Sequence, residues 1–366
     1  MKTLKTLIIT VFCMAVCGLF AGCEHHDLCY HHVHIVKIRL AFDWQDAPDA
    51  NPEGMTVYFY PEDECRSGES EGNNTIRMDF RGKEGGEIDI PIGRYRIIAY
   101  NNDSEVCFGN MTDYYSQHHI RTRDAEITEM MGGMSVRATR VARPDGTEDE
   151  RVALAPDQMW GCNATEVEIT EYGVKYKCFP MEEKDEWVGL EPIVTEHVIT
   201  LYPHDLICHY SYEIRNVEGL SLLTDACAAI TGMSPTFSIS RMMQSDDVAT
   251  IPLAARKSGD DKIVGEFLTF GHPADNAGKH RFALYAWIAT KQTSSSGTRA
   301  VEPRFFGKDE ENFDVTLQCD TAPDQRNVHL IIDGLDLTEG GTLVPPGSFD
   351  PNFGDWGEKN FDLIVK

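Results

Sequence analysis

The sequence predicts an all-β protein with two β-sandwich domains in tandem behind a secretory signal. Three observations carry this prediction. Apolar and polar residues alternate with a period of two along many short segments, which places every second side chain on one face of a strand. Turn-forming residues interrupt these segments about every 8 to 12 residues, a spacing typical of sandwiches. The chain of 366 residues has neither a Gly-x-Gly-x-x-Gly motif nor a P-loop, and its length suits two domains.

The first 22 residues have the layout of a signal peptide. Lys2 and Lys5 precede an apolar run over residues 7–20, and small residues follow it. That run is shorter than the roughly 20 apolar residues that cross a bilayer, so we expect cleavage rather than a membrane span. The order Ala21-Gly22-Cys23 resembles a lipobox, which predicts lipidation of Cys23 and a lipidated tether over residues 23–32. The alternative is an ordinary signal peptide that contains Cys23 by chance.

The charge of the chain excludes one class of partner. Without residues 1–22 the chain carries 31 basic and 59 acidic residues, a net charge of −28. Nucleic acid is therefore not expected as a partner, because a phosphate backbone requires clustered Lys and Arg. Eight cysteines remain once the signal and Cys23 are set aside. Export permits disulfides, but several of these cysteines lie within apolar stripes, which also suits free buried thiols. No pairing is predicted.

The first domain is predicted over residues 33–178. From residue 33 to residue 42, apolar residues alternate with Lys37 and Arg39. Comparable strand-like segments follow at residues 55–60, 76–80, 85–102, 135–141 and 166–170. Pro91 suits a bend or a sheet edge in the third of these, since proline cannot donate to a ladder. His118 and His119 fall between the segments and are assigned to a loop.

The second domain is predicted over residues 190–366. The stretch from residue 178 to residue 192 lacks periodicity and contains two prolines, so we place the boundary there. Alternation then predicts strands at residues 206–214, 282–288, 313–319, 328–332 and 361–365. Residues 222–231 are expected to be helical because their apolar residues follow helical spacing. Trp287 lies opposite the apolar face of its strand and is expected to point toward the surface.

Two motifs in this chain resemble a known family. They are the lipobox followed by Cys-Glu-His-His-Asp-Leu-Cys-Tyr-His-His-Val-His, and the corner Ile90-Pro-Ile-Gly-Arg-Tyr-Arg-Ile-Ile-Ala-Tyr-Asn-Asn102. The chain resembles a family of Bacteroidales lipoproteins of unassigned function that look related to fimbrillin-associated anchor and tip proteins. The resemblance implies two tandem transthyretin-like (Ig-like) β-sandwiches, an envelope location and a role in fimbrial anchoring or adhesion. It implies no catalytic residues.

One departure from the related pilus subunits narrows this expectation. Those subunits are processed at an arginine near the start of the mature chain, whereas this sequence offers only Lys37 and Arg39 there, inside a predicted core strand. The resemblance therefore favours a non-polymerising anchor or accessory protein over a shaft subunit.

Two short features could carry chemistry. Five histidines of the tether region could form a weak metal-binding site, because imidazole is a common transition-metal ligand; they are His25, His26, His31, His32 and His34. The alternative is a polar tether with no fixed geometry, and no metal site is assigned. The run Asp320-Thr321-Ala322 resembles a bacterial O-glycosylation acceptor, which would make Thr321 the modified residue.

No residue set in the sequence supports catalysis. The chain lacks Gly-x-Ser-x-Gly and a paired Cys and His in a recognisable context, so no enzyme activity and no cofactor are predicted. We expect a membrane-anchored lipoprotein of the outer membrane or cell surface that serves as an anchor, accessory or adhesin-like component of fimbriae. The alternative is a cell-surface polysaccharide-binding lipoprotein beside a nutrient importer. Glycan binding requires an exposed aromatic platform, whereas fimbrial assembly requires a strand edge that pairs with another chain.

Overall fold

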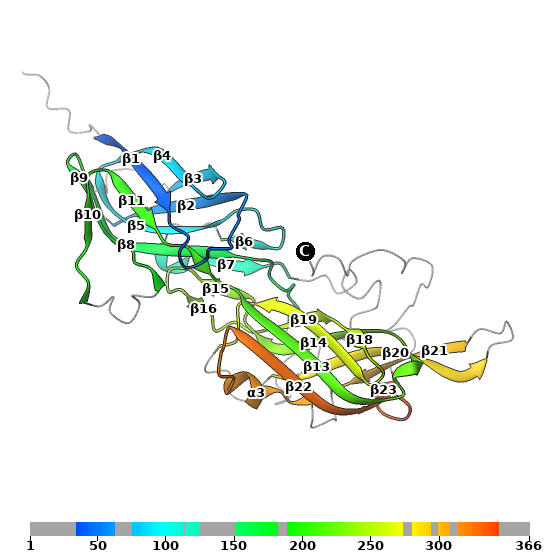
Figure 1. The fold of residues 1–366 in the computed structure, drawn as a ribbon. Helices are drawn as coiled ribbons and strands as arrows, with labels where there is room; N and C mark the ends of the chain where they lie inside the picture. Colours follow the sequence, from blue (N-terminus) through cyan, green and yellow to red (C-terminus); the bar gives the residue numbers. More distant parts are fainter. Residues whose placement is uncertain are drawn as a thin grey trace, which may run out of the picture.

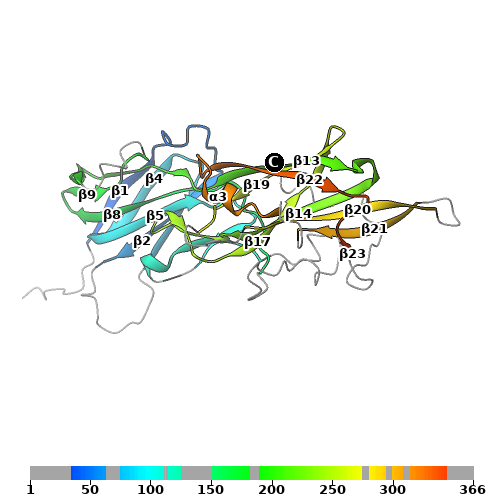
Figure 2. The same ribbon diagram turned by 90° about the horizontal axis from the view of Figure 1, so that it is seen from below.

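The structure is a computed structural model that describes residues 34–62, 75–110, 112, 114–124, 151–181, 189–273, 280–293, 299–307 and 313–343. Two β-sandwiches follow one another along an elongated molecule, and a small sheet lies between them (Figure 1, Figure 2). The predicted all-β class with two tandem sandwiches is confirmed. Among the described helices, none is long and apolar enough to cross a membrane. The predicted signal peptide lies outside the described residues.

The first sandwich packs a short sheet against a long one. In its first strand Ile38, Leu40 and Phe42 enter the core while Lys37 and Arg39 face outward, as the alternation predicts. The short sheet has the order β11 (Val198–Leu201), β1 (Ile35–Phe42), β4 (Gly85–Pro91). The long sheet has the order β10 (Ile193–Thr195), β9 (Gly173–Lys177), β8 (Trp160–Thr170), β5 (Gly93–Asn101), β2 (Gly54–Pro61), β3 (Ile76–Arg81), and β12 (His204–Asp205) pairs with β8.

The predicted corner at Pro91 carries the chain from the short sheet to the long one. The hydroxyl of Tyr95 donates a hydrogen bond to the carbonyl oxygen of Pro91 at 2.7 Å. The Tyr95 ring lies buried, with its centroid 6.0 Å from that of Phe59 in an edge-on arrangement. Burial of the ring and satisfaction of its polar tip both hold the corner in place.

We propose that the first unit extends to residue 205 rather than ending at residue 178. Strand β10 pairs with β9, and β12 pairs with β8. Strand β11 lies parallel to β1 with Arg39 opposite Val198, and Ile199 and Leu201 join the first core. The domain limits predicted from sequence placed these residues in the second domain, because the gap in alternation before them looked like a linker.

A small sheet joins the two halves of the chain. Its order is β16 (Met243–Gln244), β15 (Thr236–Ser238), β7 (His119–Thr122), β6 (Cys107–Gly109), so two strands come from each half. Between it and the long sheet lies a set of buried side chains that we call the seam cluster: Tyr58, Tyr60, Ile98, Tyr100, Cys107, Ile120, Met159, Leu206, Ile207, Phe237, Ile239 and Phe270.

The second sandwich encloses the larger core. One sheet has the order β18 (Arg256–Ser258), β19 (Lys262–Thr269), β13 (Cys208–Glu218), β22 (Asn327–Asp336). The facing sheet has the order β17 (Ala249–Ala254), β14 (Leu223–Met233), β20 (Phe282–Thr293), β21 (Arg299–Phe306), β23 (Thr342–Leu343). Short helical turns are η2 (Tyr115–Gln117), η5 (Leu220–Leu222) and α3 (Thr316–Asp320). The six described cysteines are free thiols.

Two predicted elements of the second domain are wrong. Residues 223–233 form strand β14 instead of a helix. Both faces of this strand are covered: Ala228 and Ile230 face the sandwich core, while Cys227 and Ala229 face the other side. Such a doubly buried strand has no alternation to distinguish it from a helix. Residues 316–320 form helix α3 instead of a strand, and the backbone N–H of Cys319 bonds the carbonyl of Val315. The predicted strands at 135–141 and 361–365 lie outside the described residues.

Candidate functional site

All residues of the predicted tether, 23–32, lie outside the described residues. They include Cys23, His25, His26, His31 and His32, so lipidation and metal binding by the tether stay predictions. His34 is described and lies exposed, with Nδ1 3.1 Å from a carboxylate oxygen of Glu171. That contact gives His34 an acidic neighbour on the β8–β9 turn.

Thr321 lies exposed immediately after α3. Its hydroxyl donates a hydrogen bond to the carbonyl oxygen of Leu317 at 2.7 Å, and its backbone N–H bonds the same carbonyl. Exposure at the end of a short helix suits a modifying enzyme. Glycosylation of Thr321 stays a prediction.

The three described tryptophans do not form an exposed aromatic platform. Trp44 and Trp160 are half-buried and pack edge-on, with ring centroids 6.4 Å apart, and the Trp44 indole donates to the carbonyl of Lys83. Trp287 is 5% exposed, which corrects the expectation that it points toward the surface. Trp287 does lie on the strand face predicted for it, since Ile288 faces the sandwich core and Trp287 faces the outer side of the sheet. That outer side is itself covered by other residues.

One side of the first sandwich is open at two edge strands. In the described sheets β3 pairs only with β2, and β4 pairs only with β1. The short sheet has fewer strands than the long sheet that it covers, and its edge strand β4 contacts β3 only in part. The core-facing Ile76, Met78 and Phe80 of β3 are consequently only half-buried. A further strand beside β4 would cover them.

The free edge of β4 directs backbone groups outward. The backbone N–H of Arg39 donates to His197, on the far side of β1 from β4. Arg39 therefore forms a non-hydrogen-bonded pair with Glu87, and the same alternation applies to Lys37 opposite Asp89. As a result, the N–H and C=O groups of Glu87 and Asp89 point toward the free edge. Unpaired edge groups of this kind are a template for another strand.

A hollow of about 740 Å³ with a mixed polar and apolar lining lies where the first sandwich meets the sheet of β13 and β22. Its wall includes Ser211 and His329, whose Oγ and Nδ1 atoms are 2.8 Å apart, and His329 Nε2 lies 3.4 Å from Glu213. Hydrogen bonds from Arg215 and, to a smaller extent, from Lys262 lower the pKa of Glu213 to about 2. Because this carboxylate is already paired and the set lies on an outer sheet face, the arrangement lacks the dry, preorganised setting of a hydrolase.

A buried chain of polar rings lies in the seam cluster. The Tyr60 hydroxyl lies 2.5 Å from Nδ1 of His118, and Nε2 of His118 lies 3.1 Å from the hydroxyl of Tyr100. Tyr100 in turn donates to the hydroxyl of Tyr58 at 3.4 Å. Burial, reinforced by His119, lowers the pKa of His118 to about 4. His118 is therefore a core residue, although its backbone lies in the short loop between η2 and β7, as predicted. His119, also assigned to a loop, begins strand β7 instead. Sequence spacing held no signal of the burial of His118.

Known proteins resemble both the sequence and the fold. Fim4B of Bacteroides ovatus, provisionally named a fimbrium anchoring subunit, is 24% identical over 252 residues. That match covers 69% of this chain, and the chain spans only 61% of that protein. A crystal structure of a Bacteroides ovatus protein described as an adhesin has a TM-score of 0.54 and 16% identity, over 88% of this chain and 98% of the other. The likeness to this structure establishes the fold.

A further solved structure and a family model also match this chain. The fimbrial anchor protein Mfa2 of Porphyromonas gingivalis aligns with a TM-score of 0.42 and 13% identity, over 81% of this chain and 90% of that one. The family model described as a domain of unknown function, DUF5119, matches residues 22–254, which is more than half of the chain. The motifs predicted membership of a family of unassigned function with fimbrial relatives. This prediction is confirmed. This protein therefore belongs to the DUF5119 family.

Proposed function

We propose that this protein is a lipid-anchored envelope module that acts as an anchor or accessory component of fimbriae. The single observation that carries the proposal is the free edge of β4 beside the half-buried Ile76 and Met78. The similarity to Fim4B supports the same class of function. The absence of an exposed platform among the three described tryptophans gives no support to the polysaccharide-binding alternative.

Strand addition is the mode of binding that this geometry supports. An incoming extended segment would lie along β4, pair with the outward N–H and C=O groups of Glu87 and Asp89, and place alternate apolar side chains over Ile76 and Met78. Main-chain pairing supplies affinity in such complexes, and pockets for alternate side chains supply specificity. The partner is a fimbrial subunit with an accessible strand.

We expect Asp89→Pro to weaken capture of fimbrial subunits by about tenfold, since an outward hydrogen bond of about 1 kcal/mol is lost and the ring obstructs its neighbours. The β1 ladder stays intact because the N–H of Asp89 does not face β1. Binding to purified fimbriae of the same bacterium is measured by biolayer interferometry. The matched control is Asp89→Ala, which removes the charge but keeps the N–H. Equal binding by the proline and alanine variants would contradict strand addition at β4.

We expect Cys23→Ala to release the protein from the membrane. Acyl chains contribute about 0.8 kcal/mol per buried CH₂, so their loss removes durable attachment. Fractionation of cells and intact-mass measurement check this outcome, with Cys29→Ala as the matched control that keeps its acyl groups. Unchanged membrane retention and mass in Cys23→Ala would exclude a lipid anchor at this residue, while leaving the proposal for β4 open.

A further inference from the structure

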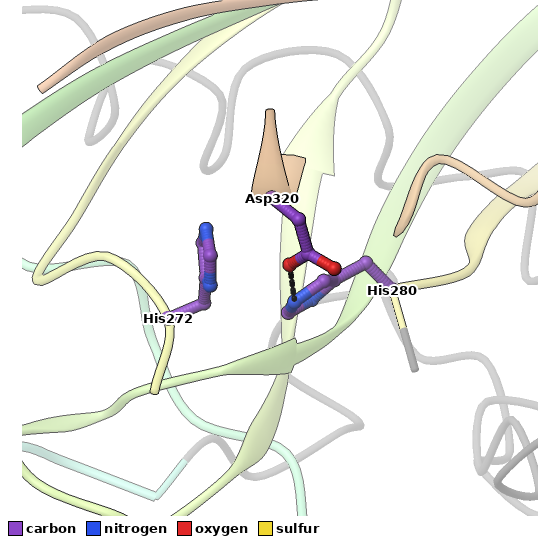
Figure 3. Close-up of side chains that lie close together, drawn as sticks. All are labelled: His272, His280 and Asp320. Carbon is purple, nitrogen blue, oxygen red and sulfur yellow. Dashed lines mark ion pairs between the residues drawn. The ribbon is translucent and has the colours of Figure 1, made fainter. Parts of the chain in front are cut away.

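Two buried histidines and an aspartate from separate segments meet in the second sandwich (Figure 3). His272 follows β19, His280 precedes β20, and Asp320 is the last residue of α3. One ring nitrogen of each histidine and one carboxylate oxygen of Asp320 lie within 4.8 Å of one another. The imidazole centroids are 4.6 Å apart and the ring planes meet at 60°.

Three of the four ring nitrogens of this cluster lack hydrogen-bond partners within the described part of the chain. Both nitrogens of His272 and Nε2 of His280 are buried and unpaired. His272 is 8% exposed and His280 is fully buried. Buried polar atoms in folded proteins are nearly always satisfied, so three unsatisfied nitrogens in one place require an explanation. Asp320 does not satisfy Nε2 of His280, because this nitrogen and the carboxylate oxygen are 4.0 Å apart, which is too far for a hydrogen bond.

The surrounding structure holds His280 in the form that binds metals. Its Nδ1 lies 3.2 Å from the carbonyl oxygen of Thr231, and a carbonyl only accepts, so Nδ1 carries the proton and Nε2 keeps a free lone pair. A backbone carbonyl behind a histidine is the usual outer partner of a metal ligand.

Hydrogen bonds also hold the backbone of both histidines in place. The N–H of His280 donates to the hydroxyl of Thr316, and its carbonyl accepts from the N–H of Val315. The carbonyl of His272 accepts from the side-chain amide of Gln244 in the small sheet. The backbone is thus held in place at both histidines, whereas the Asp320 side chain is 43% exposed and able to rotate.

We propose that His272, His280 and Asp320 bind a divalent transition-metal ion of the zinc class. Nitrogen ligands with one carboxylate suit this class, and three protein ligands leave a fourth position for water. Ligand atoms of a tetrahedral zinc site lie about 3.3 Å apart, given bonds of about 2.0–2.2 Å. The three ligand atoms here lie within 4.8 Å of one another, so metal binding draws them closer, and the half-exposed Asp320 side chain is the one with room to move. The ion then ties α3 to the segments that flank β19 and β20.

The test is zinc titration of the full-length protein, purified after export from its cell. Five substitutions prevent metal binding by the histidines near the start of the chain: His25→Asn, His26→Asn, His31→Asn, His32→Asn and His34→Asn. This variant is the parent for the comparisons below. We expect one Zn²⁺ per chain by calorimetry. His272→Asn and Asp320→Asn should each weaken the affinity by at least about tenfold, since even outer partners of metal ligands are worth 10- to 100-fold. Zn²⁺ should also raise the melting temperature of the parent and fail to raise that of Asp320→Asn.

Two controls make the outcome decisive. Asp320 is half-exposed, so Asp320→Asn keeps its fold even where His272→Asn does not, and melting without metal verifies this. His209→Asn removes an exposed histidine of the same sandwich and should leave zinc affinity unchanged. Absence of zinc binding in the parent chain, or full affinity in Asp320→Asn, would overturn the proposed site. Neither outcome bears on the β4 edge.

Discussion

Leu206→Ala is expected to lower the free energy of unfolding by about 2–5 kcal/mol and to loosen the coupling between the two sandwiches. Leu206 is 2% exposed in the seam cluster, on the segment that leads from the first sandwich into the second. Its partners in that cluster include Ile98 from the first half and Phe237 from the second. A cavity here removes contacts that both units share, because the surroundings collapse only in part.

Differential scanning calorimetry measures both effects. The ratio of van't Hoff to calorimetric enthalpy reports cooperativity and should fall in Leu206→Ala. Leu40→Ala is the matched control: this fully buried leucine belongs to the first core alone, so it should cost similar stability with a smaller loss of cooperativity. An equal effect of the two substitutions on this ratio would show that the seam cluster does not couple the sandwiches.

Acidification is expected to destabilise the protein through His118. The pKa of this residue is about 4 in the folded state, owing to burial, against 6.5 in the unfolded state. Below pH 6.5 the unfolded chain therefore binds a proton at His118 that the folded chain excludes. Protonation thus favours the unfolded state, and the free energy of unfolding falls as the pH falls from 6.5 toward 4. At about 1.4 kcal/mol per unit, the loss amounts to about 3 kcal/mol.

Urea unfolding of the parent and of His118→Gln, between pH 7.5 and pH 4, isolates this contribution. Glutamine does not titrate, so the stability advantage of the parent should shrink by about 3 kcal/mol over this range. His280 also has a lowered pKa and contributes equally to both proteins, so it cancels in the comparison. Ile120→Val, in the same seam cluster but without a titratable group, is the matched control, and its stability difference from the parent should not change with pH. A constant difference between parent and His118→Gln would disprove the role of His118.

The accuracy of the sequence prediction depended on how each strand is exposed. Strand β1 was predicted correctly because one face meets water, and Lys37 and Arg39 therefore alternate with Ile38 and Leu40. Strand β14 was mistaken for a helix because both faces are covered and Ala228 and Ala229 are equally apolar. Helix α3 was mistaken for a strand because its one turn is too short to establish a helical period.

The candidate sites depended on contacts that no local pattern encodes. His272 and Asp320 are 48 positions apart and meet only because β19, β20 and α3 converge. Among the described strands, β4 ends the short sheet at one edge, and β11, from far along the chain, ends it at the other. Such proximity follows from strand order, which period-two alternation does not specify.

The sequence by itself determined the all-β class, the tandem sandwiches and the family resemblance, because each of these rests on local periodicity or on contiguous motifs. Only the tertiary structure decided which strand edge is left open, that both halves of the chain share one seam cluster, and that His272, His280 and Asp320 lie together. The physical reason is the same in each case. These features arise from pairing and packing between segments distant in the chain, whose energies depend on the whole fold.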